Sequence, residues 1–199
     1  MTVYKLKTPI SEKDVRKLVV NDIVYISGTI ITARDAAHRR AVEYQKKRKK
    51  LPISFEGSVL FHCGPIAKKE KEEWHIIAAG PTTSSRMNLF ENKLIKNFKI
   101  RIIAGKGGMN KKTADAMEKY GAVYGAFTGG AAVLAAKAIK KVKGIKWEDL
   151  GITEAIWILE VEDFGPLTIA IDSHGKNLYE ENDEKVAKKK KKIYGKLGI

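Results

Sequence analysis

The sequence predicts a single α/β domain with a central mixed or parallel sheet flanked by helices. The middle of the chain alternates strand and helix patterns, an order that is typical of parallel sheets. Residues 100–104 form a short run that is apolar except for Arg101, which favours a strand buried on both faces of such a sheet. No internal repeat or Gly/Ser-rich linker divides the 199 residues, a length that allows one domain with a substantial core.

The first third of the chain indicates antiparallel or barrel-like strand pairs. Ser11 begins a capping box, Ser27-Gly28 interrupts a β-branched run, and Asp35 is a suitable N-cap for a basic helix. The expected elements are an extended segment over 2–10, a short helix from 11 to 18, one kinked strand or two strands over 23–31, a helix over 36–49 and a strand over 58–63.

The run from Trp74 to Ala79, apolar except for His75, predicts a buried central strand that stops at Gly80-Pro81. An amphipathic helix begins near Met87. The other elements expected are a charged turn over 68–73, a helix over 111–120, a strand over 122–127, an Ala-rich helix over 131–141, two strands over 155–161 and 167–171 joined through 162–166, and a turn over 172–175. From about residue 181 the sequence is Lys-rich and predicts a loose helix or tail.

Hydroxyl side chains follow the predicted central strand, from Thr82 to Ser85. The free amides and positive dipole end of a helix start favour an anion at such a place. Thr82 and Arg86 are four residues apart and would share one face if the first turn were already helical. An ordinary helix cap with a solvated arginine is the alternative.

Three predicted strand ends carry a cation beside glycine or hydroxyl residues: Arg34, Arg86 and Lys106. Ligands of open α/β sheets bind outside the carboxyl ends of the strands. Three cations meeting there would suit a small dicarboxylate, since arginine grips a carboxylate in a bidentate fork and lysine supplies a mobile charge. The spacing within Gly105–Gly108 excludes a P-loop, and no dinucleotide-binding glycine motif follows a strand.

The histidines and the cysteine give weaker signals. His38 is expected on a helix surface or at a cap, with a catalytic base as the alternative, and His174 either belongs to a site or holds a turn. His62 and Cys63 are neighbours on a strand, so their side chains point to opposite faces, which argues against a catalytic pair. A single cysteine excludes an internal disulfide framework and an iron–sulfur or thiolate metal site made by this chain alone.

The net charge is +15, from 38 Lys and Arg against 23 Asp and Glu. Nucleic acid, adaptation to high temperature, and an anionic substrate or acidic partner could each explain it. The basic clusters over 39–50 and 185–192 lack interleaved aromatic residues, so a nucleic-acid-binding module is disfavoured. The sequence has no signal-peptide pattern and no apolar run near the ~20 residues of a membrane span, and we expect a cytoplasmic protein.

Five motifs in order resemble the β subunit, or C-terminal domain, of class I iron–sulfur fumarate hydratases, and also the related L-tartrate dehydratase β subunit. The resemblance spans about residues 4–179. The motifs are Thr32-Ala33-Arg34-Asp35-Ala36-Ala37-His38, His62-Cys63-Gly64-Pro65, Gly80-Pro81-Thr82-Thr83-Ser84-Ser85-Arg86-Met87, Gly105-Lys106-Gly107-Gly108-Met109, and Leu159-Glu160-Val161-Glu162-Asp163-Phe164-Gly165-Pro166 with Asp172-Ser173-His174-Gly175.

The resemblance implies a swivelling β/β/α domain over residues 1–180, with 181–199 as a Lys-rich addition. It implies an α subunit that holds a [4Fe–4S] cluster on three cysteines, in an α2β2 assembly, and no metal held by this chain. Fumarate would be hydrated reversibly to L-malate, and the chain alone would be inactive. Tartrate dehydration or a related hydro-lyase reaction is the alternative.

By motif position, the resemblance also implies roles for individual residues. Thr82 would be the general base, and Thr83 would lie close to the substrate. Arg34, Arg86 and Lys106 would bind the substrate carboxylates.

Overall fold

The computed structural model describes residues 1–197. Its strands are β1 (Val3–Lys7), β2 (Ile23–Thr32), β3 (Val59–Phe61), β4 (Ile66–Glu70), β5 (Glu73–Ala78), β6 (Ile102–Gly105), β7 (Val123–Ala126), β8 (Ile139–Lys146) and β9 (Ile156–Ile171). Its helices are α1 (Glu12–Val15), α2 (Asp35–Lys46), the 3₁₀ helix η1 (Ser84–Met87), α3 (Glu91–Phe98), α4 (Lys111–Tyr120), α5 (Ala132–Ala138), the 3₁₀ helix η2 (Glu148–Leu150) and α6 (Leu178–Leu197).

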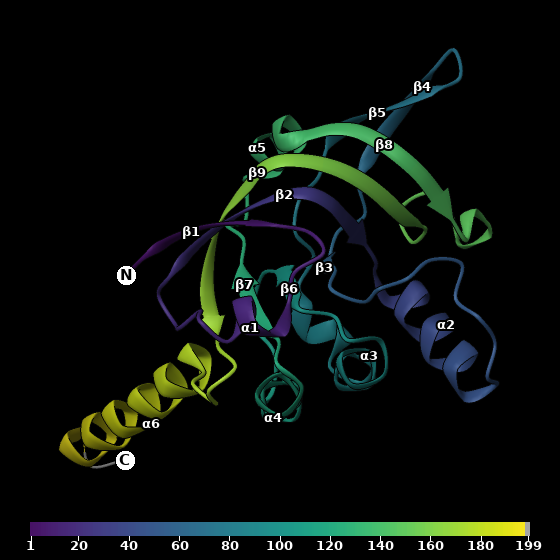
Figure 1. Ribbon diagram of the computed structural model, residues 1–199. Coiled ribbons are helices and arrows are strands. Elements are labelled where there is room, and N and C mark those ends of the chain that lie inside the picture. The colour runs from purple at the N-terminus through teal and green to yellow at the C-terminus, as the bar shows by residue number, and fades with distance from the viewer. Residues whose placement is uncertain (198–199) are drawn as a thin grey trace.

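A mixed sheet in the order β1-β2-β3-β6-β7-β9-β8 forms the centre of the molecule. Strands β1, β2, β3, β6 and β7 run parallel, and β9 is antiparallel to β2, β7 and β8. Because β9 also pairs with β2, strands β2, β3, β6, β7 and β9 close into a ring. The predicted fold class, a mixed sheet flanked by helices, is confirmed (Figure 1).

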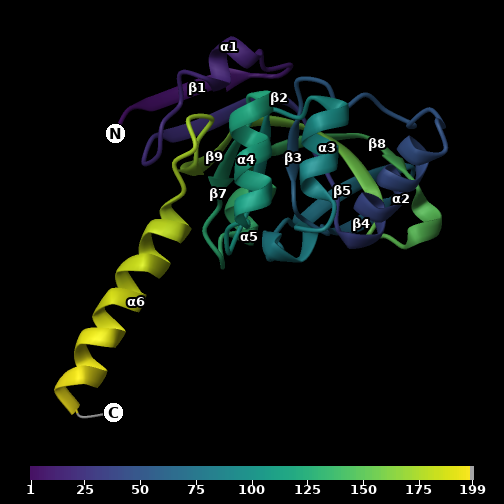
Figure 2. The same cartoon turned by 90° about the horizontal axis from the view of Figure 1, so that it is seen from below.

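Two apolar cores lie on the two faces of this sheet. One joins inward side chains of the ring, among them Phe61, Trp157 and Phe164. The other joins the opposite strand faces to α2, α3 and α4, which lie together on one side of the sheet (Figures 1 and 2). Strand β6 is buried along its whole length, as its apolar sequence predicts.

The prediction of a buried central strand over 74–79 was wrong. Strand β5 forms a separate two-stranded hairpin with β4, and its residues alternate between exposed and half-buried. Trp74 and Ile76 pack on the ring core, while Ile77 on the other face is 55% exposed. The apolar run thus has the period of two that a half-buried strand shows. The charged turn predicted over 68–73 is the tip of this hairpin together with parts of its two strands.

Other differences come from polar or bent strands. The helix predicted over 131–141 ends at Ala138, and the Lys-rich strand β8 follows as an edge strand paired with β9. Lysines on an exposed edge discourage further strand pairing, but they also weaken the apolar pattern by which a strand is predicted from sequence. The two strands predicted over 155–161 and 167–171 are one, β9, which continues through residues 162–166.

The C-terminal Lys-rich segment is helical from Leu178, and α6 extends away from the body of the molecule (Figure 2). Ser11 caps α1 as expected, by accepting a hydrogen bond from the amide of Asp14. Among residues 1–197, no helix is both long and apolar enough to cross a bilayer.

Candidate functional site

The hydroxyl-rich turn after β5 is held to the ends of two core strands by main-chain hydrogen bonds. The amide of Thr82 donates to the carbonyl of His62, just after β3, over 2.6 Å. Thr83 and Lys106 form a parallel bridge, and the amide of Ser84 donates to the carbonyl of Lys106 over 2.8 Å. The backbone therefore brings Thr82, Thr83 and Lys106 together at the carboxyl ends of β3 and β6.

The two predicted arginines reach the same edge from the start of α2 and from η1. The guanidinium of Arg34 lies 3.3 Å from a carboxylate oxygen of Glu154 and packs on Gly64, where an added Cβ would come within 2.8 Å of Arg34 Nη1. Arg86 forms a two-point ion pair with Asp35, the residue after Arg34. Each arginine is thus oriented by a carboxylate.

Asp35 was predicted to cap α2, and this was wrong. Asp35 is the first residue of the helix, Arg34 is at the N-cap position without a side-chain cap bond, and the Asp35 carboxylate faces Arg86. Glu154 instead accepts a hydrogen bond from the amide of Ala36 over 2.9 Å. Thr82 precedes η1, so the premise that it shares a helical turn with Arg86 is not met.

The site is open to solvent. The side chains of Arg34 and Arg86 are 22% and 48% exposed, Thr83 and Lys106 are exposed, and Thr82 is half-buried. Within residues 1–197, Lys106 takes part in no ion pair. A mobile lysine beside two oriented arginines can bind a small anion with more than one carboxylate.

Beneath this edge lies a buried polar cluster that sequence reasoning missed: His38, His62, Glu91, Ser84 and Tyr124, all fully buried. Glu91 Oε2 lies 2.9 Å from His38 Nε2 and 3.0 Å from His62 Nε2. His38 was expected on a helix surface or at a cap, and the surface placement was wrong. A signal was present: His38 and Glu91 lie on the apolar stripes of their helices, three and four residues before buried apolar side chains.

His174 and Cys63 contribute no chemistry to this edge. His174 lies in the turn after β9, where its ring contacts the carbonyl of Arg16. Cys63 packs in the ring core while His62 faces the opposite side, as expected for neighbours on a strand. Burial raises the pKa of the Cys63 thiol to about 12, which disfavours the reactive thiolate.

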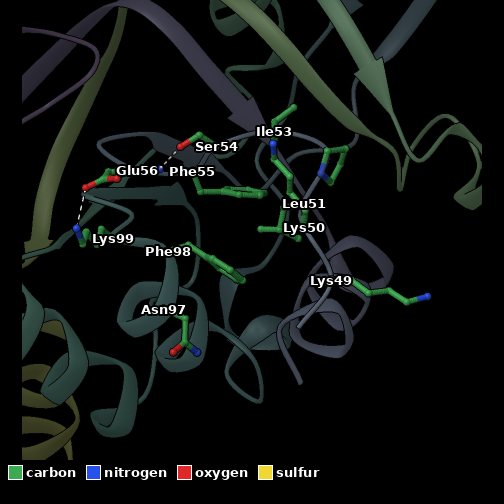
Figure 3. A pocket seen from close by; sticks show the side chains of 11 residues that line it. Lys49, Lys50, Leu51, Ile53, Ser54, Phe55, Glu56, Asn97, Phe98 and Lys99 are labelled. Carbon is green, nitrogen blue, oxygen red and sulfur yellow. Dashed lines mark hydrogen bonds and ion pairs between the residues drawn. The ribbon is translucent and has the colours of Figure 1, made fainter. Parts of the chain in front are cut away.

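A groove of about 650 Å³ lies elsewhere, between the segment after α2 and the end of α3 (Figure 3). Leu51, Ile53, Phe55 and Phe98 line it, and the Lys99–Glu56 ion pair lies at one side. It lies beyond the C-terminal ends of α2 and α3, whereas the arginines lie at or before their starts. The groove is therefore separate from the candidate site.

Comparison with known proteins places the chain in a family of hydro-lyase components. The family model described as "Fumarase C-terminus" matches residues 2–182, and the chain belongs to this family.

Relatives include a protein of Methanocaldococcus jannaschii, provisionally named L(+)-tartrate dehydratase subunit beta, which is 46% identical over 94% of this chain and 96% of its own length. The L(+)-tartrate dehydratase subunit beta of Escherichia coli is 38% identical over 94% of this chain and 92% of its own length. A protein of Geobacillus stearothermophilus, provisionally named fumarate hydratase class I, is 41% identical over 90% of this chain but only 34% of its own length.

Proposed function

We propose that this chain is the β subunit of a two-subunit hydro-lyase acting on a four-carbon dicarboxylate. Its substrate is fumarate, hydrated reversibly to L-malate, or L-tartrate. The observation that carries the proposal is the meeting of Arg34, Arg86 and Lys106 with Thr82 at one open sheet edge. Names of relatives that this chain covers almost entirely support the reaction class.

The proposed reaction requires cations that bind carboxylates and a group that accepts a proton, and these side chains supply both. Dehydration of malate removes a proton from the carbon beside a carboxylate, so negative charge develops on that carboxylate. Arg34, Arg86 and Lys106 bind the carboxylates and stabilise this charge, which is the usual source of most rate acceleration. Thr82 takes the proton, and Thr83 contacts the substrate. A threonine hydroxyl becomes an adequate base only where cations stabilise its alkoxide in a dry site.

The exposure of the site supports a partner that covers it. Arg86, half exposed here, would bind a dicarboxylate more strongly once water is excluded. The Geobacillus relative is about three times as long as the region it shares with this chain. We infer that its additional length corresponds to the α subunit, and that the two subunits assemble as α2β2 in the cytoplasm.

The [4Fe–4S] cluster of the proposed complex has no place in this chain. Clusters are held by several thiolates, whereas this sequence has one cysteine, whose thiol is buried with a raised pKa. The cluster therefore belongs to the α subunit, and departure of the substrate hydroxyl is left to that subunit. The present chain supplies the half of the active site that binds the carboxylates and accepts the proton.

The test is co-purification of the chain with its α subunit under anaerobic conditions, followed by assays with fumarate, L-malate and L-tartrate. We expect turnover by the complex and none by either chain alone, and the ratio of kcat/KM values identifies the substrate. Light scattering of the complex measures its stoichiometry. Turnover by the isolated chain, or an inactive complex with a loaded cluster, would overturn the proposal.

A further inference from the structure

The buried cluster links the two segments that carry the candidate site. His38 Nδ1 lies 2.7 Å from the carbonyl oxygen of Arg34. His62 Nδ1 lies 2.9 Å from the hydroxyl of Ser84, and Ser84 follows Thr83 in the hydroxyl-rich turn. Glu91, at the start of α3, is the shared partner of both histidines. The chain of contacts therefore connects the backbone of one predicted substrate-binding segment to the side chain of the other.

Donor and acceptor chemistry fixes the protons on His38. The Arg34 carbonyl can only accept a hydrogen bond, so Nδ1 of His38 carries a proton. Nε2 faces Glu91 Oε2, and a carboxylate also only accepts, so this nitrogen carries a proton as well. His38 is then an imidazolium. Burial by itself lowers the pKa of His38, but the charge and hydrogen bond of Glu91 outweigh it, and the pKa is raised.

The same reasoning makes His62 neutral. Its Nε2 donates to Glu91. The Tyr124 hydroxyl donates to Ser84 Oγ over 3.0 Å, which leaves the Ser84 proton free to donate to His62 Nδ1. Burial lowers the pKa of His62, only partly offset by Glu91. One imidazolium and one carboxylate thus compensate each other in a site without water access.

We propose that Glu91 is a positioning residue of the hydro-lyase site: with imidazolium His38 and neutral His62, its carboxylate holds the Arg34 backbone and the Ser84 hydroxyl at a fixed separation. The inference rests on the proposed function. It also explains why residue 105 is glycine: any Cβ at this position would overlap the Ser84 hydroxyl and break its hydrogen bond with His62. Arg34, Thr82 and Thr83 need not contact Glu91 to depend on it.

A metal ion is the competing occupant. The ligand atoms of His38, His62 and Glu91 all lie within 4.8 Å of one another, and Glu91 Oε1 has no hydrogen-bond partner in the part of the chain that the structure describes. Both imidazole nitrogens, however, meet the same carboxylate oxygen at hydrogen-bond length, which favours protons between these atoms. Besides Glu91, Asp35 lies near both histidines, and its negative charge favours the protonated form of each.

Imidazole ¹⁵N NMR of the full chain at pH 8 tests the protonation directly. We expect two protonated nitrogens on His38, and on His62 a proton on Nε2 alone. In Glu91→Gln the compensating charge is gone, and His38 becomes neutral at this pH. A bare nitrogen on wild-type His38 would overturn the proposal, as would one equivalent of metal bound to the two histidines in elemental analysis.

Positioning is tested in the complex by comparing Glu91→Gln with Leu94→Ala, a buried control on the same helix outside the cluster. We expect kcat to fall at least tenfold in Glu91→Gln but less than threefold in Leu94→Ala, even where the latter lowers Tm more. Amide exchange should accelerate in residues 34–38 and 82–86 only in Glu91→Gln.

Parallel losses of activity and Tm in both variants, with unchanged exchange in these segments, would overturn the positioning role. An inactive wild-type complex would instead remove the proposed function, and the NMR and exchange results would still decide whether Glu91 joins the two segments.

Discussion

Arg86 and Asp35 form a two-point ion pair between η1 and the first residue of α2. Nε of Arg86 lies 3.2 Å from Oδ1 of Asp35, and Nη2 contacts Oδ2. Because Asp35 directly follows Arg34, this pair fixes Arg86 beside the segment that carries the other predicted arginine. A guanidinium held in advance loses less conformational freedom when it binds a carboxylate.

Replacing Arg86 with alanine should lower kcat/KM of the reconstituted complex at least ~30-fold, because loss of one partner of a charge pair that the proposed α subunit covers costs about 2–5 kcal/mol. The control is Arg39→Ala, which removes an exposed arginine of α2 outside the candidate site. Steady-state kinetics of both complexes measure the difference. If the two variants behave alike, Arg86 is not a substrate ligand.

Thr82→Val keeps the shape of the side chain and removes its hydroxyl. If Thr82 accepts the proton, the chemical step should slow by at least ~10²-fold, the low end for general base catalysis. Substrate should still bind, since the cations remain, and Thr82→Ser should keep part of the activity. Exchange of the malate C3 proton in the complex measures the step.

The competing role for Thr82, a helix cap, predicts a loss of about 1 kcal/mol in stability without an effect on chemistry. The structure weakens this alternative, since Thr83 is at the N-cap position of η1 and makes no side-chain cap bond. A lower Tm with normal proton exchange in Thr82→Val would nevertheless leave Thr82 without a catalytic role.

Sequence patterns predicted the helical layer and the strands β6 and β7 well, because those segments are apolar where they face the cores. Antiparallel or barrel-like pairs were indicated for the first third of the chain, but β1, β2 and β3 pair in parallel, and β2 is antiparallel only to β9. Helix α4 has the predicted bounds, and β6 is the buried strand that its composition indicates. Strand β8 was missed because its apolar residues, such as Val142 and Ile145, do not alternate regularly with its lysines. The pairing of β8 with β9 contains register shifts, which go with this irregular pattern. Its strand identity depends on pairing with β9, which is a long-range property.

The three candidate cations Arg34, Arg86 and Lys106 could be named from the sequence, since each follows a predicted strand end. The buried cluster could not. His38, His62 and Glu91 are brought together by the packing of α2, β3 and α3, and no local spacing predicts that contact. The positions of His38 and Glu91 on the apolar stripes of their helices were the available indication that polar groups are buried there.

Cys63 should be unreactive toward iodoacetamide in the native chain at pH 8. Its thiol is buried, and its pKa of about 12 leaves almost no thiolate. The same reaction in denaturant should reach one label per chain, which provides the control. Labelling of the native chain at the rate seen in denaturant would contradict the buried placement.

The pH dependence of stability should reveal both histidines of the cluster, with opposite signs. His62 has a lowered pKa, so below its ordinary value of 6.5 the unfolded chain binds a proton that the folded chain does not. Its contribution is therefore lost as the pH falls below about 6.5. His38 has a raised pKa, so its contribution is complete below 6.5 and is lost as the pH rises toward the folded value.

The contribution of this pair to the free energy of unfolding should therefore be largest near pH 6.5. It should fall on either side of that pH by up to about 1.4 kcal/mol per pH unit for each proton. Urea unfolding between pH 5 and 8.5 measures the free energy of unfolding, and the difference between wild type and each variant isolates the contribution of one histidine. His62→Gln should flatten the acid limb and His38→Gln the alkaline limb. Glu91 adds a further loss below its ordinary pKa of 4.5, outside this range. Identical pH profiles in wild type and both variants would show that the histidines titrate as they do in the unfolded chain, which the buried geometry does not permit.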